Sequence, residues 1–156
     1  MAEFVMKKLV GNSEDFEIAS AATSTEEIGN PVYPPARRML AMHGIDCSGK
    51  TARQMTARDY EYYDYIVLMD RNNLRNLRWI LPADVYARET DLARNLQPMD
   101  AGGDAGRHKV SLLMDWVGKS RDVADPWYTG DFVATWDDVN EGCNAMLAQI
   151  GHMFQA

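Results

Sequence analysis

The chain has 156 residues, and its hydrophobic content of 46% and charged content of 25% are typical of a single globular domain with a sizeable core. Its net charge of −7 argues against nucleic acid or an anionic membrane as the main partner. No apolar run has transmembrane length, and Lys7 and Lys8 interrupt the first apolar segment. We therefore predict neither a membrane span nor a signal peptide and expect a cytoplasmic protein.

The first part of the chain predicts three helices and one strand. Apolar residues at helical spacing indicate a helix over residues 1–10, and a short strand that runs into small residues is predicted over 16–23. Pro35 suits the first position of a helix that continues to His43. A further short helix is predicted over 57–63.

The clearest strand covers residues 65–69. Its nearly continuous apolar sequence is typical of a strand covered on both faces. Asp70 lies at the carboxyl end of this strand, which is where open parallel sheets bind ligands. A helix is predicted over residues 72–81 and another strand over 109–114. Strands that alternate with helices predict an α/β fold with a parallel sheet.

A long connection covers residues 82–108. Connections beyond about 12 to 15 residues are uncommon unless they are functional or flexible, so we predict an insertion here. It is expected to contain an extra helix over 83–96 and a loop over 100–106, and to lie at the amino end of the sheet, away from the chemistry. The last helix begins at Asp131, and its predicted apolar face carries Phe132, Trp136, Val139, Cys143 and Leu147.

The best chemical candidate lies between residues 121 and 132. Asp125 precedes Pro126, which has no backbone N–H and biases the aspartate away from helical geometry. Two aromatic residues, Trp127 and Tyr128, follow. An acid held on a rigid loop beside aromatic rings suits a general acid, although Asp-Pro pairs also occur in ordinary turns.

Two other patterns point to phosphate chemistry. Residues 44–51 match the Gly-x4-Gly-Lys-Ser/Thr loop of nucleotide-binding proteins, and Asp70 after its strand resembles the magnesium-binding partner of a kinase. The context disagrees, because such a loop follows a buried strand and this one follows a predicted helix. Residues 47–53 satisfy the spacing Cys-x5-Arg, but Gln54 stands where a phosphatase loop has Ser or Thr. The three histidines show no metal-ligand spacing, so no metal or cofactor is predicted.

Several motifs follow one another in the order found in the low-molecular-weight protein tyrosine phosphatases, which this sequence resembles nearly from end to end. They are Ser20-Ala-Ala-Thr-Ser24, Glu27-Ile-Gly-Asn-Pro31, His43-Gly-Ile-Asp46, Ala52-Arg-Gln54 and Val67-Leu-Met-Asp70, together with Asp125-Pro126. The resemblance implies one three-layer α/β/α domain over residues 1–156 with a parallel sheet in the order 2-1-3-4. It also implies hydrolysis of phosphotyrosine through a phosphocysteine intermediate, without a cofactor.

The resemblance implies roles for individual residues. Asp125 matches the aspartate that protonates the departing phenolate and later activates water. Trp127 and Tyr128 match the aromatic residues that line the mouth of the pocket, where they stack on the substrate ring. Glu26 and Glu27 fall in the loop that borders the entrance.

Two further matches are to supporting residues, and one part of the site has no match. Ser20 matches the serine that supports the phosphate loop, and Asp70 matches an aspartate beside the pocket floor. The family's nucleophile and phosphate clamp lie in a Cys-x5-Arg loop after its first strand, whereas Met1 and the residues after it match the sequence that follows this loop. We therefore expect the first strand and the nucleophile loop to be absent from this chain, and the 156-residue polypeptide to be inactive by itself.

Three interpretations remain. The first is an active phosphatase whose start is placed at an internal methionine, with the strand and the loop encoded before Met1. The second is a naturally shortened, non-catalytic binding protein, and the third is a nucleotide kinase built on residues 44–51. The phosphatase interpretation implies a phosphotyrosine-containing protein or peptide as the partner. Without the first strand, residues 16–23 and 65–69 are expected to flank a gap and to favour self-association through exposed strand edges.

Overall fold

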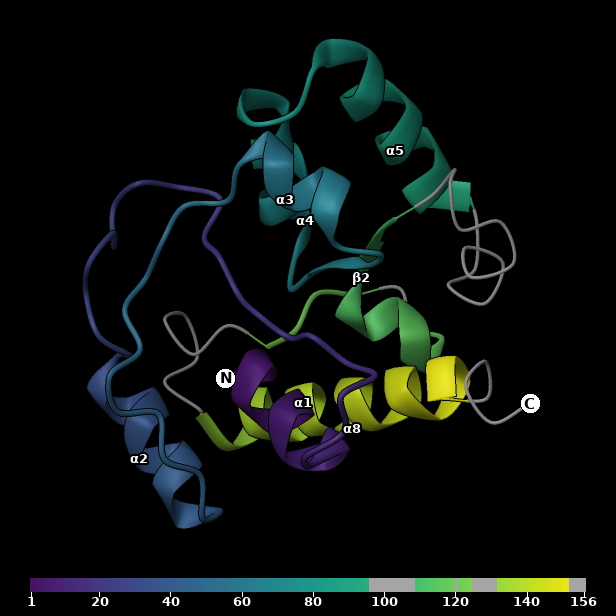
Figure 1. The fold of residues 1–156 in the computed structure, drawn as a ribbon. Coiled ribbons are helices and arrows are strands. Elements are labelled where there is room, and N and C mark those ends of the chain that lie inside the picture. The colour runs from purple at the N-terminus through teal and green to yellow at the C-terminus, as the bar shows by residue number, and fades with distance from the viewer. Residues whose placement is uncertain (96–108, 120, 125–131, 152–156) are drawn as a thin grey trace.

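The computed structural model describes residues 1–95, 109–119, 121–124 and 132–151. Figure 1 shows the arrangement of the helices and strands. They are α1 Ala2–Val10, α2 Pro34–Met42, α3 Ala57–Tyr62, β1 Ile66–Leu68, α4 Arg71–Asn76, a short 3-10 helix η1 Leu77–Trp79, α5 Ala83–Asn95, β2 Val110–Leu112, a second 3-10 helix η2 Leu113–Val117, and α8 Phe132–Gly151. No helix among these is long and apolar enough to cross a membrane.

The sheet consists of β1 and β2, which pair in parallel. Ile66 lies opposite Val110, and Leu68 lies opposite Leu112. Both strands form where the apolar sequence predicts them, although each is shorter than its apolar run. Because the two strands are parallel and helices lie between them in the chain, the prediction of an α/β fold is confirmed.

Helices cover both faces of the sheet, and β1 contributes side chains to each face. Ile66 and Leu68 belong to one buried cluster, whereas Tyr65, Val67 and Met69 pack against the other, as the two-residue period of a strand requires. Figure 1 shows α3, α4 and α5 on one side of the sheet and α1 and α8 on the other. The chain therefore forms three layers, as the nearly continuous apolar run predicts.

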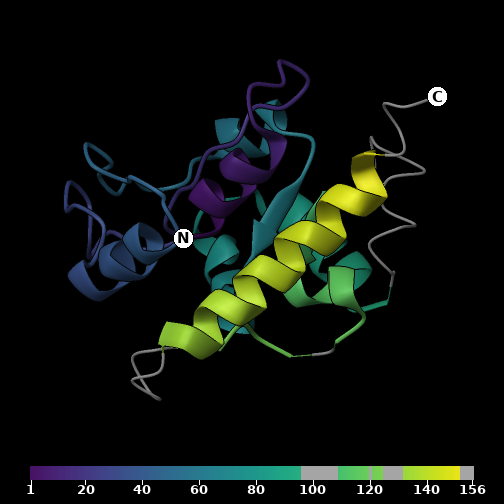
Figure 2. The ribbon, with the colours of Figure 1, turned by 90° about the horizontal axis from the view of Figure 1, so that it is seen from below.

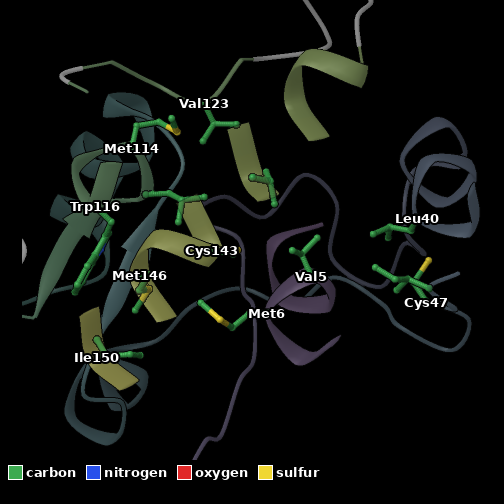
Figure 3. Packing of buried hydrophobic residues seen from close by; sticks show 13 residues of the cluster. Val5, Met6, Leu40, Cys47, Met114, Trp116, Val123, Cys143, Met146 and Ile150 are labelled. Carbon is green, nitrogen blue, oxygen red and sulfur yellow. The ribbon is translucent and has the colours of Figure 1, made fainter. Parts of the chain in front are cut away.

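The larger cluster lies between α1, α8 and η2. Figure 3 shows Val5 and Met6 of α1 and Cys143 and Met146 of α8 within it. Seen from below in Figure 2, α8 crosses the whole face of the molecule. Its contact with η2 is close at Gly142, where an added Cβ would lie 2.5 Å from Cγ of Leu113.

Residues 16–23 do not form the predicted strand, and this is the main correction to the sequence analysis. Within the described residues they make only an isolated bridge, between Ala22 and Gln54. Phe16 and Ile18 are partly buried against the larger cluster, while Glu17 is exposed. The alternation of apolar and polar residues over 16–18 therefore indicates that one side of the segment is buried. A strand also needs a neighbouring strand with which to form backbone hydrogen bonds, and burial of one side does not provide it.

The predicted extra helix within the insertion is present as α5, and its Glu89 is almost completely buried. The Glu89 carboxylate accepts backbone hydrogen bonds from Lys109 and Val110 at the start of β2. It also accepts a hydrogen bond from the Tyr60 hydroxyl. Helix α5 thus contacts the amino end of the sheet, as the topology predicts, and Asp70 lies at the opposite end of β1. The predicted loop at 100–106 lies outside the described residues.

Candidate active site

The carboxyl end of β1 is organised by Asp70 and Asn73. The Asp70 carboxylate accepts the backbone N–H of Asn73 at 2.7 Å and caps α4. In return, the side-chain oxygen of Asn73 accepts the backbone N–H groups of Met69 and Asp70 at 3.2 and 3.3 Å. This reciprocal cap fixes the turn that follows the strand and gives Asp70 a defined orientation.

Thr23 joins a second segment to this turn. Its hydroxyl oxygen accepts hydrogen bonds from the side-chain amides of Asn73 at 3.5 Å and Asn76 at 3.3 Å. The two asparagines lie three residues apart, so they lie on the same side of α4. The segment that contains Ser20 is thereby held beside the carboxyl end of β1.

Ser20 itself contacts Glu3 near the start of α1. The buried Glu3 carboxylate accepts the Ser20 hydroxyl at 2.6 Å and forms ion pairs with Lys7 at 2.6 Å and Lys50 at 2.8 Å. Burial alone would raise the pKa of Glu3, but hydrogen bonds from Lys50, Lys7 and Ser20 outweigh it and lower the pKa to about 2. One carboxylate thus ties together α1, the Ser20 segment and the loop that contains Lys50.

The chain that leads to Asp125 is anchored to the same end of β1. The backbone N–H of the buried Val123 donates to the carbonyl oxygen of Met69 at 2.9 Å. One residue earlier, the Asp122 carboxylate accepts the backbone N–H of Arg71 at 3.0 Å. These two bonds fix residues 121–124 against the strand end and the first turn of α4.

The other side of this segment is held by α8. The guanidinium of Arg121 donates two hydrogen bonds to the Asp138 carboxylate, which also accepts the backbone N–H of Ala124 at 2.9 Å. The Thr135 hydroxyl donates to the carbonyl oxygen of Ala124 at 2.7 Å. The residue before Asp125 is therefore bonded through both of its backbone polar groups.

Several of the predicted site residues cannot be placed. Asp125, Trp127 and Tyr128 lie outside the described residues. Glu26 and Glu27 are exposed, and the Glu27 carboxylate accepts the side-chain amide of Asn30 at 2.7 Å. The structure thus brings the segments of Ser20, Asp70 and residues 121–124 to one region and leaves the two glutamates on the surface.

A pocket of about 270 Å³ opens between α1, α2 and the segments around Ser20 and Lys50. Its wall contains Met1, Phe4, Ser20, Asn30, Pro31, Val32, Tyr33, Ala36, Lys50 and Ala52. The wall is mixed, with apolar side chains beside a hydroxyl, an amide and an ammonium group.

Neither cysteine has the environment of a nucleophile. Cys47 is 3% exposed, and Cys143 is 2% exposed on the inner face of α8. Burial raises the pKa of the Cys143 thiol to about 11, which disfavours the reactive thiolate at neutral pH. Figure 3 shows Cys47 beside Leu40 in the buried cluster. The Cys-x5-Arg spacing at 47–53 therefore joins a buried thiol to an exposed arginine that is paired with Asp59.

The nucleotide-loop pattern also lacks its structural context. The chain enters residues 44–51 from helix α2 instead of from a buried strand. The ammonium group of Lys50 is paired with the Glu3 carboxylate. Because a phosphate loop needs its lysine and backbone amides directed at the ligand, this arrangement does not resemble one. Among the described residues, no group of three histidine, cysteine or carboxylate side chains is placed to hold a metal ion.

Sequence reasoning missed most of the residues that hold the site together. Glu3 is an acidic residue inside an otherwise apolar helix face, with Lys7 four residues later, and that pattern was a usable signal. The bond between Thr23 and Asn73 has no local signal, because the two residues lie 50 positions apart in the chain. The pair of Arg121 and Asp138 is likewise visible only in the folded chain.

A parallel sheet covered by helices on both faces, with polar residues gathered at the carboxyl end of a strand, defines a three-layer α/β protein with its candidate site at that edge. The family model described as low molecular weight phosphotyrosine protein phosphatase matches residues 1–89. The low molecular weight phosphotyrosine protein phosphatase of Homo sapiens is 45% identical over 153 residues, which cover 94% of this chain and 84% of that protein. The chain belongs to this family.

Other relatives agree with this assignment. The low molecular weight protein-tyrosine-phosphatase YfkJ of Bacillus subtilis is 29% identical over 155 residues, covering 96% of this chain and 86% of that protein. The crystal structure of YfkJ superposes with a TM-score of 0.76 at 30% identity, and the match covers 99% of this chain and 87% of that structure. The fold and the sequence therefore indicate the same family.

Proposed function

We propose that this chain forms the acid-bearing side of a site that hydrolyses phosphotyrosine in proteins, with Asp125 as the general acid. The observation that carries the proposal is the anchoring of residues 121–124 between β1 and α8. Val123 is bonded to Met69, and Ala124 is bonded to both Asp138 and Thr135. The backbone that leads to the proposed proton donor is therefore held in place. Proton transfer in a transition state requires a positioned donor, so this anchoring supports the role.

The chemistry explains why an acid is needed. The phenol of tyrosine has a pKa of about 10, so its phenolate is a poor leaving group at neutral pH and gains from protonation as the P–O bond breaks. General acid catalysis of this kind contributes about 10²- to 10⁴-fold. Pro126 restricts the backbone of Asp125, while Trp127 and Tyr128 offer aromatic faces for the substrate ring.

The remaining predicted residues take supporting roles in this proposal. Ser20 and Asp70 support the loops around the phosphate position. In the 156-residue chain the Ser20 hydroxyl donates to the Glu3 carboxylate, and the Asp70 carboxylate accepts the backbone N–H of Asn73. Glu26 and Glu27 border the entrance, where their charge affects which peptides approach. A phosphotyrosine-containing protein or peptide is the proposed partner.

Whether the 156-residue polypeptide can hydrolyse a phosphate ester by itself depends on its two cysteines. Both thiols are buried, and neither faces a phosphate cradle. We therefore propose that the 156-residue polypeptide alone does not hydrolyse aryl phosphates and acts, at most, as a binding protein. Hydrolysis in this proposal requires an apolar strand and a Cys-x5-Arg-Ser-Pro loop to be present beside α1.

The test compares two purified proteins. One is the 156-residue chain, and the other carries an apolar strand followed by a Cys-x5-Arg-Ser-Pro loop fused before Met1. Hydrolysis of p-nitrophenyl phosphate and of a phosphotyrosine peptide is expected only in the fused protein. A fused protein whose loop cysteine is replaced by serine is the matched control and should be inactive. If the fused protein folds but shows no more activity than this control, the proposed site is wrong.

Two variants of the 156-residue chain separate the alternatives. If the 156-residue chain hydrolyses an aryl phosphate and Cys47→Ser abolishes this activity, Cys47 is a nucleophile and the proposal is contradicted. If the chain binds ATP and Lys50→Ala abolishes this binding, the nucleotide kinase is favoured instead. We expect neither, because Cys47 is buried and Lys50 is paired with Glu3.

A further inference from the structure

Three arginines and a tryptophan form an exposed surface on α4 and η1. Arg71, Arg75 and Arg78 are all exposed, and Trp79 is 75% exposed. The arginines follow one another at intervals of four and three residues, which places them on one face of a helix that tightens into a 3-10 turn. We call these four residues the arginine face.

The other sides of the same helix are already used. Leu77 is completely buried, and Leu74 packs against the same cluster. Asn73 and Asn76 donate to the Thr23 hydroxyl on another side. The helix is therefore fixed by its packing, and the arginine face is presented to solvent from a rigid support.

The charge of this face contrasts with the rest of the chain. Residues 71–79 contain three arginines and no acidic residue, within a chain whose net charge is −7. Arg71 lies 3.6 Å from the Asp122 carboxylate, a long and exposed ion pair. Arg75 donates to the side-chain oxygen of Asn72 at 3.0 Å, and Arg78 lies over the Trp79 ring at 4.7 Å. In the part of the chain that the structure describes, neither Arg75 nor Arg78 has a carboxylate partner.

We propose that the arginine face binds an acidic segment of a partner protein. A guanidinium group donates in a planar fork that matches a carboxylate, and two such groups on one rigid face select a chain with two acidic residues. The Trp79 ring lies against the Arg78 guanidinium on one side and is otherwise exposed, so it adds apolar contact area of the kind that anchors peptide interfaces. An acidic, flexible segment satisfies both groups at once.

The size of the face favours a protein segment over other anions. Recognition of an anionic membrane or of nucleic acid uses larger basic surfaces, typically four to eight basic residues for lipid headgroups. The negative charge of the remaining chain also repels extended polyanions. A short acidic peptide needs only the local charge of Arg75 and Arg78.

The position of the face suggests which proteins it selects. Arg71 contacts Asp122, so the face begins beside the anchored segment 121–124 and extends away from it. At about 1.5 Å per residue, the distance from Arg71 to Arg78 is about 10 Å, which an extended peptide spans in about three residues. Acidic residues in the chain that flanks the phosphotyrosine would reach Arg75 and Arg78, and this identification of the partner as a substrate rests on the proposed function.

The test uses the 156-residue chain and an unphosphorylated peptide, so it does not depend on hydrolysis. A fluorescein-labelled peptide with alternating Glu and Asp residues is titrated in 50 mM salt and followed by fluorescence anisotropy, beside a control peptide in which Gln and Asn replace the acids. We expect the acidic peptide to bind at least tenfold more tightly than the control peptide. The double variant Arg75→Glu with Arg78→Glu should weaken that binding at least tenfold.

The matched control is Arg37→Glu with Arg38→Glu, which makes the same two charge reversals on the exposed side of α2 and should alter binding less than twofold. Circular dichroism checks folding, and Arg75→Gln with Arg78→Gln replaces the charge reversal if that variant does not fold. Equal effects of the control and of the double variant at Arg75 and Arg78, or equal binding of the acidic and neutral peptides, would overturn the proposal. A second test uses vesicles with 20% phosphatidylserine. If the protein binds these vesicles but not the acidic peptide, and the double variant at Arg75 and Arg78 abolishes vesicle binding, the arginine face binds membranes and the proposal is overturned as well.

Discussion

The carboxylate of Asp138 accepts hydrogen bonds from both terminal guanidinium nitrogens of Arg121, each at 2.7 Å, although the two residues lie 17 positions apart. Asp138 is buried on α8 and also accepts the backbone N–H of Ala124. A bidentate pair has a fixed geometry, so it holds the backbone of residues 121–124 as well as the charge. The course of the chain before the proposed acid therefore depends on this carboxylate as well as on the bonds to Met69, Arg71 and Thr135.

Asp138→Asn should destabilise the protein. The amide keeps the shape of the side chain but loses one acceptor and the negative charge that Arg121 faces. Hydrogen bonds to charged groups contribute about 1.5 to 3 kcal/mol, and partial exposure of Arg121 reduces this, so we expect a loss of about 2 kcal/mol in the free energy of unfolding. Urea denaturation measures it. The neighbouring exposed Asp137→Asn is the control, and equal losses in both variants would show that the pair is not responsible.

The ion pairs of Glu3 should make stability depend on acidic pH. Its pKa is lowered from 4.5 to about 2 in the folded chain, so the carboxylate stabilises the fold above the unfolded pKa. This contribution, on the order of 2 kcal/mol, is lost as the pH falls from about 4.5 towards 2. Arg121 lowers the pKa of Asp138, which adds a dependence of the same sign.

Glu3→Gln tests this dependence directly. The variant should be less stable than the parent at pH 7, and most of the difference should be lost as the pH falls to about 2, where half of the parent carboxyl groups are protonated. Thermal unfolding at a series of pH values measures the difference. The exposed Glu61→Gln is the control and should follow the parent across the series. A constant difference between parent and Glu3→Gln would show that the ion pairs do not set the pKa of Glu3.

Gly142→Ala should destabilise α8 even though alanine is the better helix former. The new Cβ would lie 2.5 Å from Cγ and 2.9 Å from Cδ1 of the buried Leu113. Overpacking costs about 1 to 3 kcal/mol, whereas replacing a helical glycine by alanine gains up to about 1 kcal/mol. We expect a net loss on the order of 1 kcal/mol in chemical denaturation. The double variant with Leu113→Ala should recover part of the loss relative to Leu113→Ala alone.

Asp125→Ala should slow hydrolysis through the leaving-group step in the fused protein described above. The loss should be larger for a phosphotyrosine peptide than for p-nitrophenyl phosphate, because p-nitrophenolate leaves readily without a proton. Steady-state rates on both substrates measure the difference, with the exposed Asp137→Ala on α8 as a control that removes a carboxylate outside the anchored segment. Equal losses on the two substrates would remove Asp125 from the acid role.

The sequence predicts the fold correctly where a local pattern of apolar residues, or a proline, is enough to determine the structure of a segment. The apolar run at 65–69 requires cover on both faces and receives it, and Pro34 and Pro35 begin α2. The predicted helix at 72–81 is divided into α4 and η1, and the predicted apolar face of the last helix includes the buried Val139 and Cys143. Periodicity thus identifies the buried side of an element better than its exact bounds.

The segment 16–23 shows why the rest could not be predicted. Its alternation is real, since Phe16 and Ile18 are partly buried, but pairing depends on a second strand elsewhere in the chain. The bonds that build the candidate site have the same property. Ser20 to Glu3 and Thr23 to Asn73 join residues 17 and 50 positions apart, and a single sequence does not report such distances.

The last prediction concerns the second edge of β1. In a parallel pair, alternate residues bond to the same neighbour, and the bond from the N–H of Ile66 to Lys109 assigns Ile66 and Leu68 to β2. The N–H and C=O of Val67 therefore point to the opposite edge, where no strand among the described residues pairs with β1. Segment 16–23 was expected beside a gap next to this edge and forms no ladder there.

An apolar edge of this kind recruits another chain, because pairing satisfies its backbone groups without rearranging the helices above and below. We expect the 156-residue chain to self-associate at micromolar concentration, with a weight-average mass that rises with concentration in sedimentation velocity. The fused protein, whose added strand pairs with this edge, should remain monomeric under the same conditions. A compact 156-residue monomer that melts cooperatively at every concentration would show that the edge of β1 is stable without a partner.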